Sequence, residues 1–197
     1  MSKAHVLAVY TLANTADRCE GMAWYVRAKD LAIAICRQYP VSPYQAVGVI
    51  AALSPRNKWE RNVADAENLI RVFCTDPESV DSVKVCTFGS NKVKAIAILN
   101  LADGADGGDV RAILSGPKLT EFFNCIMDEK DDVCIDGHAY SVWAGDRITL
   151  ANVPSIGIKL RREIKAAYRE AAAEYGISAA QMQAVTWCTW RRIYGVA

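Results

Sequence analysis

The periodicity of apolar residues is the feature that most constrains the fold of this chain. Apolar side chains recur every three or four residues along most of the sequence, which is the spacing of one face of an α-helix. The alternation of apolar and polar residues that is typical of half-buried strands is rare. We therefore predict an all-α protein, a bundle of roughly eight or more helices. The predicted helices cover residues 22–39, 44–53, 58–73, 90–101, 119–127, 137–144, 159–175 and 178–194.

Residues that favour helix ends support several of these boundaries. Ser42, followed by Pro43, is expected to cap the second predicted helix, and Ser90 is expected to cap the fourth. Gly176 separates the last two helices, and the DGADGGD stretch at 103–109 is predicted to be a loop.

Composition limits the function classes that remain. The chain has 23 basic and 22 acidic residues, a net charge of +1, which argues against a strongly basic coat for nucleic acid. No two of its seven cysteines form a CxxC pair, so neither a zinc site nor an iron–sulfur cluster is indicated. We expect no metal and no cofactor. The opening residues lack a signal peptide, and no apolar stretch approaches the length of a membrane span. We expect a cytoplasmic monomer with no membrane partner.

The stretch from Ile113 to Gly145 carries the clearest chemistry. Its SGPK run, ending in Lys118, predicts a tight turn before a helix, and backbone N–H groups beside a helix N-terminus can hold a phosphate. After that helix the apolar run VCI leads to Asp136 at the start of the next helix. Asp136 has two interpretations: an N-cap of helix 137–144, or a carboxylate that stabilises a cationic sugar or activates a nucleophile. Lys118 is either a solvated or phosphate-contacting side chain, or a nucleophile.

This stretch resembles the catalytic core of the helix-hairpin-helix DNA glycosylases, especially the endonuclease III-like branch. In that family a Gly-rich hairpin ends in a Lys, and an apolar run then leads to an Asp in a D-x-H pattern. Here the hairpin ends at Lys118, and DGH begins 18 residues later at Asp136. The resemblance implies that Asp136 assists loss of a base and that Lys118 attacks the sugar C1′. It also implies a two-lobed bundle within one domain, 1–197, with the hairpin and Asp136 in a lobe at about 45–145 and the terminal helices in the second lobe.

Two upstream segments are similar to the same family. Residues 49–66, VIAALSPRNKWERNVADA, resemble the early helix–loop–helix that fills the gap left by an extruded base, with Arg56 at the filling position. Residues 91–99, NKVKAIAIL, resemble the helix before the hairpin. Two features depart from the family: Leu114 replaces the first hairpin Gly, and the four-cysteine iron–sulfur loop is absent.

Further residues are candidates for contact with double-stranded DNA and with an extruded base. The residues expected to contact DNA are Arg56, Asn57, Lys58, Ser115, Gly116 and His138. The residues expected to line the substrate pocket are Trp59, Tyr140 and Gln183. Helical spacing favours packing between helices for Trp59 and Gln183, and places Tyr140 on the same helix as Trp143.

Three functions are compatible with this pattern. The first is a DNA N-glycosylase, with AP-lyase activity through Lys118. The second is a phage DNA hypermodification enzyme, because the segments SPRNxW, KxxxF and IDxHA resemble phage proteins related to the glutamyl or putrescinyl thymine pyrophosphorylases, which act on activated 5-hydroxymethyluracil. For a phage protein, the cytoplasm would be that of the bacterial host. The third is a non-catalytic DNA-binding module.

Overall fold

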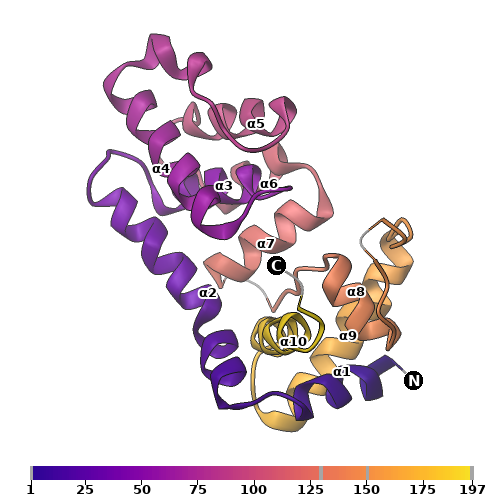
Figure 1. Ribbon diagram of the computed structural model, residues 1–197. Helices are drawn as coiled ribbons and strands as arrows, with labels where there is room; N and C mark the ends of the chain where they lie inside the picture. The colour runs from indigo at the N-terminus through magenta and orange to yellow at the C-terminus, as the bar shows by residue number, and fades with distance from the viewer. Residues whose placement is uncertain (1, 129–130, 150, 196–197) are drawn as a thin grey trace. The chain divides into compact units, whose positions relative to one another are not determined.

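The computed structural model of the chain describes residues 2–128, 131–149 and 151–195. Over these ranges the backbone forms ten α-helices and one 3-10 helix, with no strand (Figure 1). The prediction of an all-α protein is confirmed. The helices are α1 (Ser2–Thr11), α2 (Thr15–Cys36), α3 (Pro43–Leu53), α4 (Trp59–Thr75), η1 (Pro77–Ser82), α5 (Gly89–Leu99), α6 (Gly107–Leu114), α7 (Pro117–Met127), α8 (Gly137–Ala144), α9 (Ile158–Tyr175) and α10 (Ala179–Tyr194).

The chain divides into two compact units. The central unit is the continuous segment Ala28–Met127, whereas the terminal unit combines Met1–Arg27 with Asp128–Ala197. Helix α2 begins in the terminal unit and ends in the central unit. None of the described helices is both long and apolar enough to cross a membrane.

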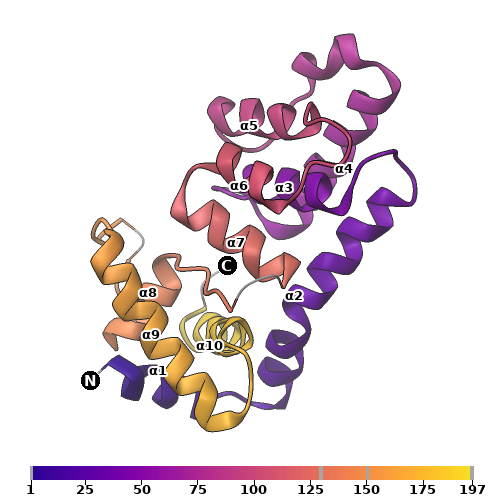
Figure 2. The same cartoon turned by 180° about the vertical axis from the view of Figure 1, so that it is seen from behind.

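Helix α3 forms the centre of the core of the central unit. Its residues from Ala46 to Leu53 are all buried, and α4, α5, α6 and α7 pack around it (Figure 2). The helix begins with a capping box, in which Ser42 Oγ accepts a hydrogen bond from the N–H of Gln45 and Gln45 Oε1 accepts one from the N–H of Ser42. The Gln45 amide also donates to the carbonyl of Leu99, 3.1 Å away, and so ties the start of α3 to the end of α5.

The core of the terminal unit is built from both ends of the chain. Val6 and Tyr10 of α1 pack with Ile164 and Tyr168 of α9 and with Val185 of α10 in one buried cluster. Helix α8 closes the same cluster through Ala139 and Val142, among others. Removing either end of the chain would therefore expose apolar surface that the other end covers.

The predicted helices are present, with differences at their ends. Ser42 caps α3 as predicted, but Ser90 is the second residue of α5, and Phe88 occupies the N-cap position without a side-chain cap. Helix α6 begins at Gly107 because Asp106 accepts the N–H groups of Gly108 and Asp109, so only part of 103–109 is a loop. Helices α1, η1 and α6 and the first turns of α2 were not predicted.

Candidate functional site

The predicted hairpin lies in the central unit as two helices joined by two residues. Helix α6 ends at Leu114, Ser115 and Gly116 form the connection, and α7 begins at Pro117. Ser115 has the left-handed backbone conformation that ends many helices, with φ of 52°. The Lys94 ammonium donates to the carbonyl of Leu114, 2.6 Å away, and to the Ser115 hydroxyl, 3.0 Å away. A cation therefore neutralises the carbonyl end of α6 at the turn.

The backbone of this turn makes no special demand on Leu114. Leu114 is fully buried and is still part of α6, so it needs no positive φ. Gly116 is half-buried, and a Cβ added there would meet only the Leu114 carbonyl oxygen, at 3.8 Å. Lys118 is exposed in the first turn of α7. The backbone N–H groups of that turn have no partner within the helix, which is the arrangement that favours anions.

A second exposed feature of the central unit is the loop between α3 and α4. Arg56 is exposed and has a φ of 56°, which is unusual for a residue with a side chain. Its guanidinium carbon lies 5.1 Å from the ring centroid of Phe88, a residue that is 50% exposed. Phe88 belongs to the loop before α5, so this loop and the α3–α4 loop together form one exposed surface that is both aromatic and cationic.

The buried carboxylate of Asp65 holds these two loops together. It accepts hydrogen bonds from Arg61 Nε at 2.6 Å, from the backbone N–H of Cys86 at 2.7 Å and from Asn57 Nδ2 at 3.2 Å. The Thr87 hydroxyl adds a bond to the carbonyl of Pro55 at 3.0 Å. The side-chain amide of Asn57, predicted to contact DNA, thus donates inside the protein.

The neighbouring predicted residues have different exposures. Lys58, at the N-cap of α4, is exposed. Trp59 is half-buried and meets Phe122 edge to face, with ring centroids 6.5 Å apart. Trp59 therefore contributes to packing between α4 and α7.

Asp136 lies in the terminal unit at the N-cap of α8. Its Oδ1 accepts the N–H of Ala139 at 2.8 Å, and the buried residues 133–135 precede it. The side chain is half-buried, and Oδ2 makes no hydrogen bond within the described ranges. Beneath the same turn, the Tyr168 hydroxyl donates to the carbonyl of Ala139 at 3.2 Å. Burial raises the pKa of Tyr168 far above its usual range, and the negative charge of Asp136 adds to this effect.

The remaining predicted residues surround α8 and α10 in the terminal unit. His138 is half-buried and makes no hydrogen bond to any residue of the described segments. Tyr140 packs against Trp143 with ring centroids 5.7 Å apart. Gln183 is buried, and its Oε1 accepts a hydrogen bond of 2.7 Å from the hydroxyl of Tyr25.

The predicted site residues therefore fall into two groups. The central unit holds Arg56, Asn57, Lys58, Trp59, Ser115, Gly116 and Lys118, and the terminal unit holds Asp136, His138, Tyr140 and Gln183. The predicted lobe at 45–145 includes parts of both units, and the helices at the two ends of the chain belong to one unit. Sequence analysis missed Phe88, Lys94 and Asp65, whose roles depend on contacts between distant segments.

Among the described residues, no group of three or more His, Cys, Asp or Glu side chains could hold a metal ion. All seven cysteines are free thiols, and three of them are buried.

Comparison with known proteins gives a family but not an activity. The model of a family of unknown function (DUF7178) matches residues 1–193, so the chain belongs to this family. No curated protein and no solved structure matches the chain.

Proposed function

We propose that this DUF7178 member is a DNA N-glycosylase that binds double-stranded DNA as a monomer and acts on an extruded nucleotide. Asp136 is the catalytic carboxylate, and Lys118 is the nucleophile of an accompanying lyase step. Such chemistry needs the base to leave the stack, since the atoms of the glycosidic bond are inaccessible inside a duplex. The proposal rests on the resemblance and on three features of the two units.

The hairpin of the central unit supports binding to a DNA phosphate. The start of α7 offers backbone N–H groups and the positive end of a helix dipole, and Lys118 adds a cation in the same turn. Contacts of this type fix the position of a protein on DNA without reading the sequence. We therefore assign Ser115 and Gly116 to the phosphate backbone beside the target nucleotide, which places Lys118 next to that nucleotide.

The exposed pair of Arg56 and Phe88 supports extrusion of a base. The Phe88 ring provides a flat apolar surface for stacking, and the Arg56 guanidinium supplies hydrogen-bond donors for the base left without a partner. Asp65 holds both loops in place in the absence of DNA, so the loops lose little conformational entropy when DNA binds. We assign this pair to the space that the extruded nucleotide vacates.

The state of Asp136 is the observation that carries the proposal. One carboxylate oxygen is fixed by the N–H of Ala139, while Oδ2 has no hydrogen-bond partner in the described part of the chain. A carboxylate held in this way can face a sugar that gains positive charge as its glycosidic bond breaks. An N-cap alone needs only the first of these two oxygens.

Lys118 and Asp136 have different roles in the proposed reaction. The Lys118 amine forms a bond to C1′, the electron pair of the glycosidic bond leaves with the base, and the proton released from the amine goes to that base. The C1′–O4′ bond then breaks with its electron pair on O4′, which takes a proton from water, while the nitrogen lone pair of Lys118 completes an iminium to C1′. Asp136 stabilises the positive charge on the sugar during base loss.

The test is incubation of the purified protein with duplexes that carry uracil, thymine glycol, or 5-hydroxymethyluracil with and without its pyrophosphate ester. Base release, strand breaks and borohydride-trapped adducts are measured together for the wild type, Asp136→Asn and Lys118→Ala. We expect base release that Asp136→Asn abolishes, and adducts that Lys118→Ala abolishes.

Other results would contradict the proposal and identify the alternatives. Intact glycosidic bonds on every substrate, with release of pyrophosphate from the activated base, would indicate the hypermodification transferase. DNA binding that is unchanged in Asp136→Asn, without any reaction, would indicate a non-catalytic module.

A further inference from the structure

Lys94 of α5 is a cation that contacts only uncharged oxygens. Its ammonium donates to the carbonyl of Leu114 at 2.6 Å and to the hydroxyl of Ser115 at 3.0 Å, and it forms no ion pair with any described residue. The side chain is half-buried, so it has a restricted position beside the turn. The carbonyl end of α6 carries only a partial negative charge, and part of the positive charge of Lys94 therefore remains unbalanced at the turn.

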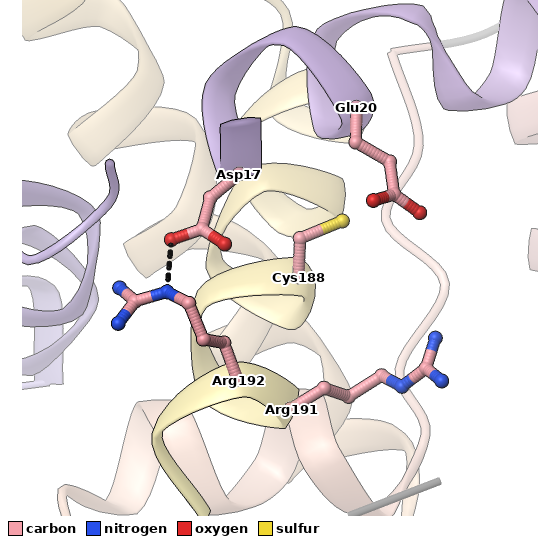
Figure 3. A pocket seen from close by; sticks show the side chains of 5 residues that line it. All are labelled: Asp17, Glu20, Cys188, Arg191 and Arg192. Carbon is pink, nitrogen blue, oxygen red and sulfur yellow. Dashed lines mark hydrogen bonds and ion pairs between the residues drawn. The ribbon is translucent and has the colours of Figure 1, made fainter. Parts of the chain in front are cut away.

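A polar pocket of the terminal unit contains a cation in the opposite, balanced state. The pocket lies where the start of α2 is beside the end of α10, and Asp17 and Arg192 are among the residues that line it (Figure 3). Arg192 Nε donates to Asp17 Oδ2 at 2.8 Å, and its Nη2 donates to the carbonyl of Leu12 at 2.8 Å. Because a buried carboxylate balances this guanidinium, Arg192 joins the two helices and has little charge left for a ligand. Lys94 has a carbonyl partner of the same kind but no carboxylate.

The contact with Lys94 also limits the direction of the Ser115 hydroxyl. Ser115 is exposed, and its Oγ accepts a hydrogen bond from the ammonium, so its own proton points away from Lys94. The ammonium has a third N–H beyond the two that it donates to Leu114 and Ser115. Neither this N–H nor the Ser115 proton has an acceptor within the described ranges. The turn thus offers two hydrogen-bond donors and a positive charge, which suit an oxyanion.

We propose that Lys94 and Ser115 together bind one phosphate of the DNA strand, and that Lys94 rather than Lys118 supplies the charge of this contact. A phosphodiester shares one negative charge between two oxygens, so it can accept from both side chains at once. The inference rests on the proposed function and deepens it, because that function needs the Lys118 amine for attack on C1′. A lysine that neutralises a phosphate is held in its protonated form, which has no lone pair for attack. Assigning the two lysines to different tasks removes this conflict.

Duplexes with single uncharged linkages test this proposal on the full chain. Each duplex carries a tetrahydrofuran abasic analogue, which fixes the register, and one phosphate at a time is replaced by a methylphosphonate. Fluorescence anisotropy gives the dissociation constants. We expect replacement at one position to weaken binding by the wild type at least about fivefold and binding by Lys94→Met less than about twofold.

The salt dependence of binding gives a second readout that needs no fixed register. Lys94→Met should weaken binding to the unmodified duplex at least about fivefold, and it should lower the slope of log Kd against log salt concentration by about 0.9, as expected for the loss of one phosphate contact. At saturating DNA the variant should still form the borohydride-trapped adduct that Lys118→Ala loses. Loss of the adduct in Lys94→Met under these conditions would overturn the division of tasks.

Lys92 provides the matched control for these measurements. It is half-buried on the same helix and also donates to a backbone carbonyl, that of Asp81, at 2.6 Å. Lys92→Met should leave the affinity, the salt slope and the response to every methylphosphonate unchanged. Ser115→Gly is a second variant that keeps the fold, because glycine favours the left-handed backbone at this position. It should weaken binding about threefold and respond less than the wild type to the same single replacement.

The remaining outcomes separate this inference from the proposed function. If no methylphosphonate position depended on Lys94, and Lys94→Met and Lys92→Met had equal salt slopes, the inference would be overturned even with normal base release by the wild type. If binding depended on Lys94 at one phosphate but the wild type released no base, the phosphate contact would stand and the glycosylase would be contradicted. Circular dichroism establishes that each variant is folded.

Discussion

At the scale of single residues, Gly21 determines how closely α2 can approach α10. A Cβ at this position would lie 2.4 Å from the Cα of Val185, and that backbone atom cannot move without shifting α10. We predict that Gly21→Ala lowers the free energy of unfolding by about 3 kcal/mol, at the upper end of the usual cost of overpacking. Urea denaturation followed by circular dichroism measures this change.

Gly89 provides the matched control for this substitution. It is also a helical glycine, but a Cβ added there meets no atom within 4 Å. Gly89→Ala should leave the stability unchanged or raise it by up to about 1 kcal/mol, because alanine favours the helix. Equal losses of stability in the two variants would show that α2 does not approach the backbone of α10 closely at Gly21.

Asp136 combines two roles that different substitutions separate. Asp136→Ala removes the cap on α8 and should cost about 1 kcal/mol of stability. Asp136→Asn retains an oxygen for the N–H of Ala139, so it should fold with near-normal stability while losing the charge that the reaction needs. We predict that both variants lose base release and that only the alanine variant melts earlier. Activity in Asp136→Asn would remove this carboxylate from the mechanism.

At the scale of elements, the loops before α4 and α5 depend on Asp65. Asp65→Ala would leave the N–H of Cys86 and the amide of Asn57 without their acceptor. We predict a loss of about 3 kcal/mol in stability, as expected for breaking a buried charged network. DNA binding should weaken as well, since Arg56 and Phe88 lose their fixed positions.

Fluorescence anisotropy with a labelled duplex measures the binding, and thermal melting measures the stability. Asp103→Ala removes an exposed carboxylate from another loop of the central unit and should change neither quantity. If Asp65→Ala were destabilised but bound DNA normally, these two loops would not contact DNA.

Prediction from sequence succeeded where a helix has one apolar face and a polar cap. Helix α3, with Ser42 and Pro43 before it, is the clearest case. Helix α1 was missed although Val6, Val9 and Tyr10 have the spacing of one helical face, because other apolar residues such as Leu7 lie between them and obscure that period. The position of Phe88 beside Arg56 was also unpredictable, since it depends on the contact of Thr87 with Pro55, which lies 32 residues away.

At the scale of the whole molecule, the two units differ in how the chain builds them. The central unit is one continuous segment with its own buried core around α3, whereas the terminal unit requires both ends of the chain. We predict that a fragment of residues 28–127 folds into helices and binds DNA but releases no base, because Asp136 is missing. Circular dichroism and anisotropy test this directly, and an unfolded fragment would show that the central unit depends on the rest of the chain.

The proposed function requires this protein to hold DNA with one nucleotide out of the stack. A duplex that carries a tetrahydrofuran abasic analogue tests it without knowledge of the target base, because the cost of unstacking that base is absent. The measurement is the ratio of dissociation constants for intact and abasic duplexes, for the wild type and for Arg56→Ala/Phe88→Ala. We predict that the wild type binds the abasic duplex at least about tenfold more tightly and that the double variant loses this preference. Equal affinity of the wild type for both duplexes, or no binding to either, would contradict the claim.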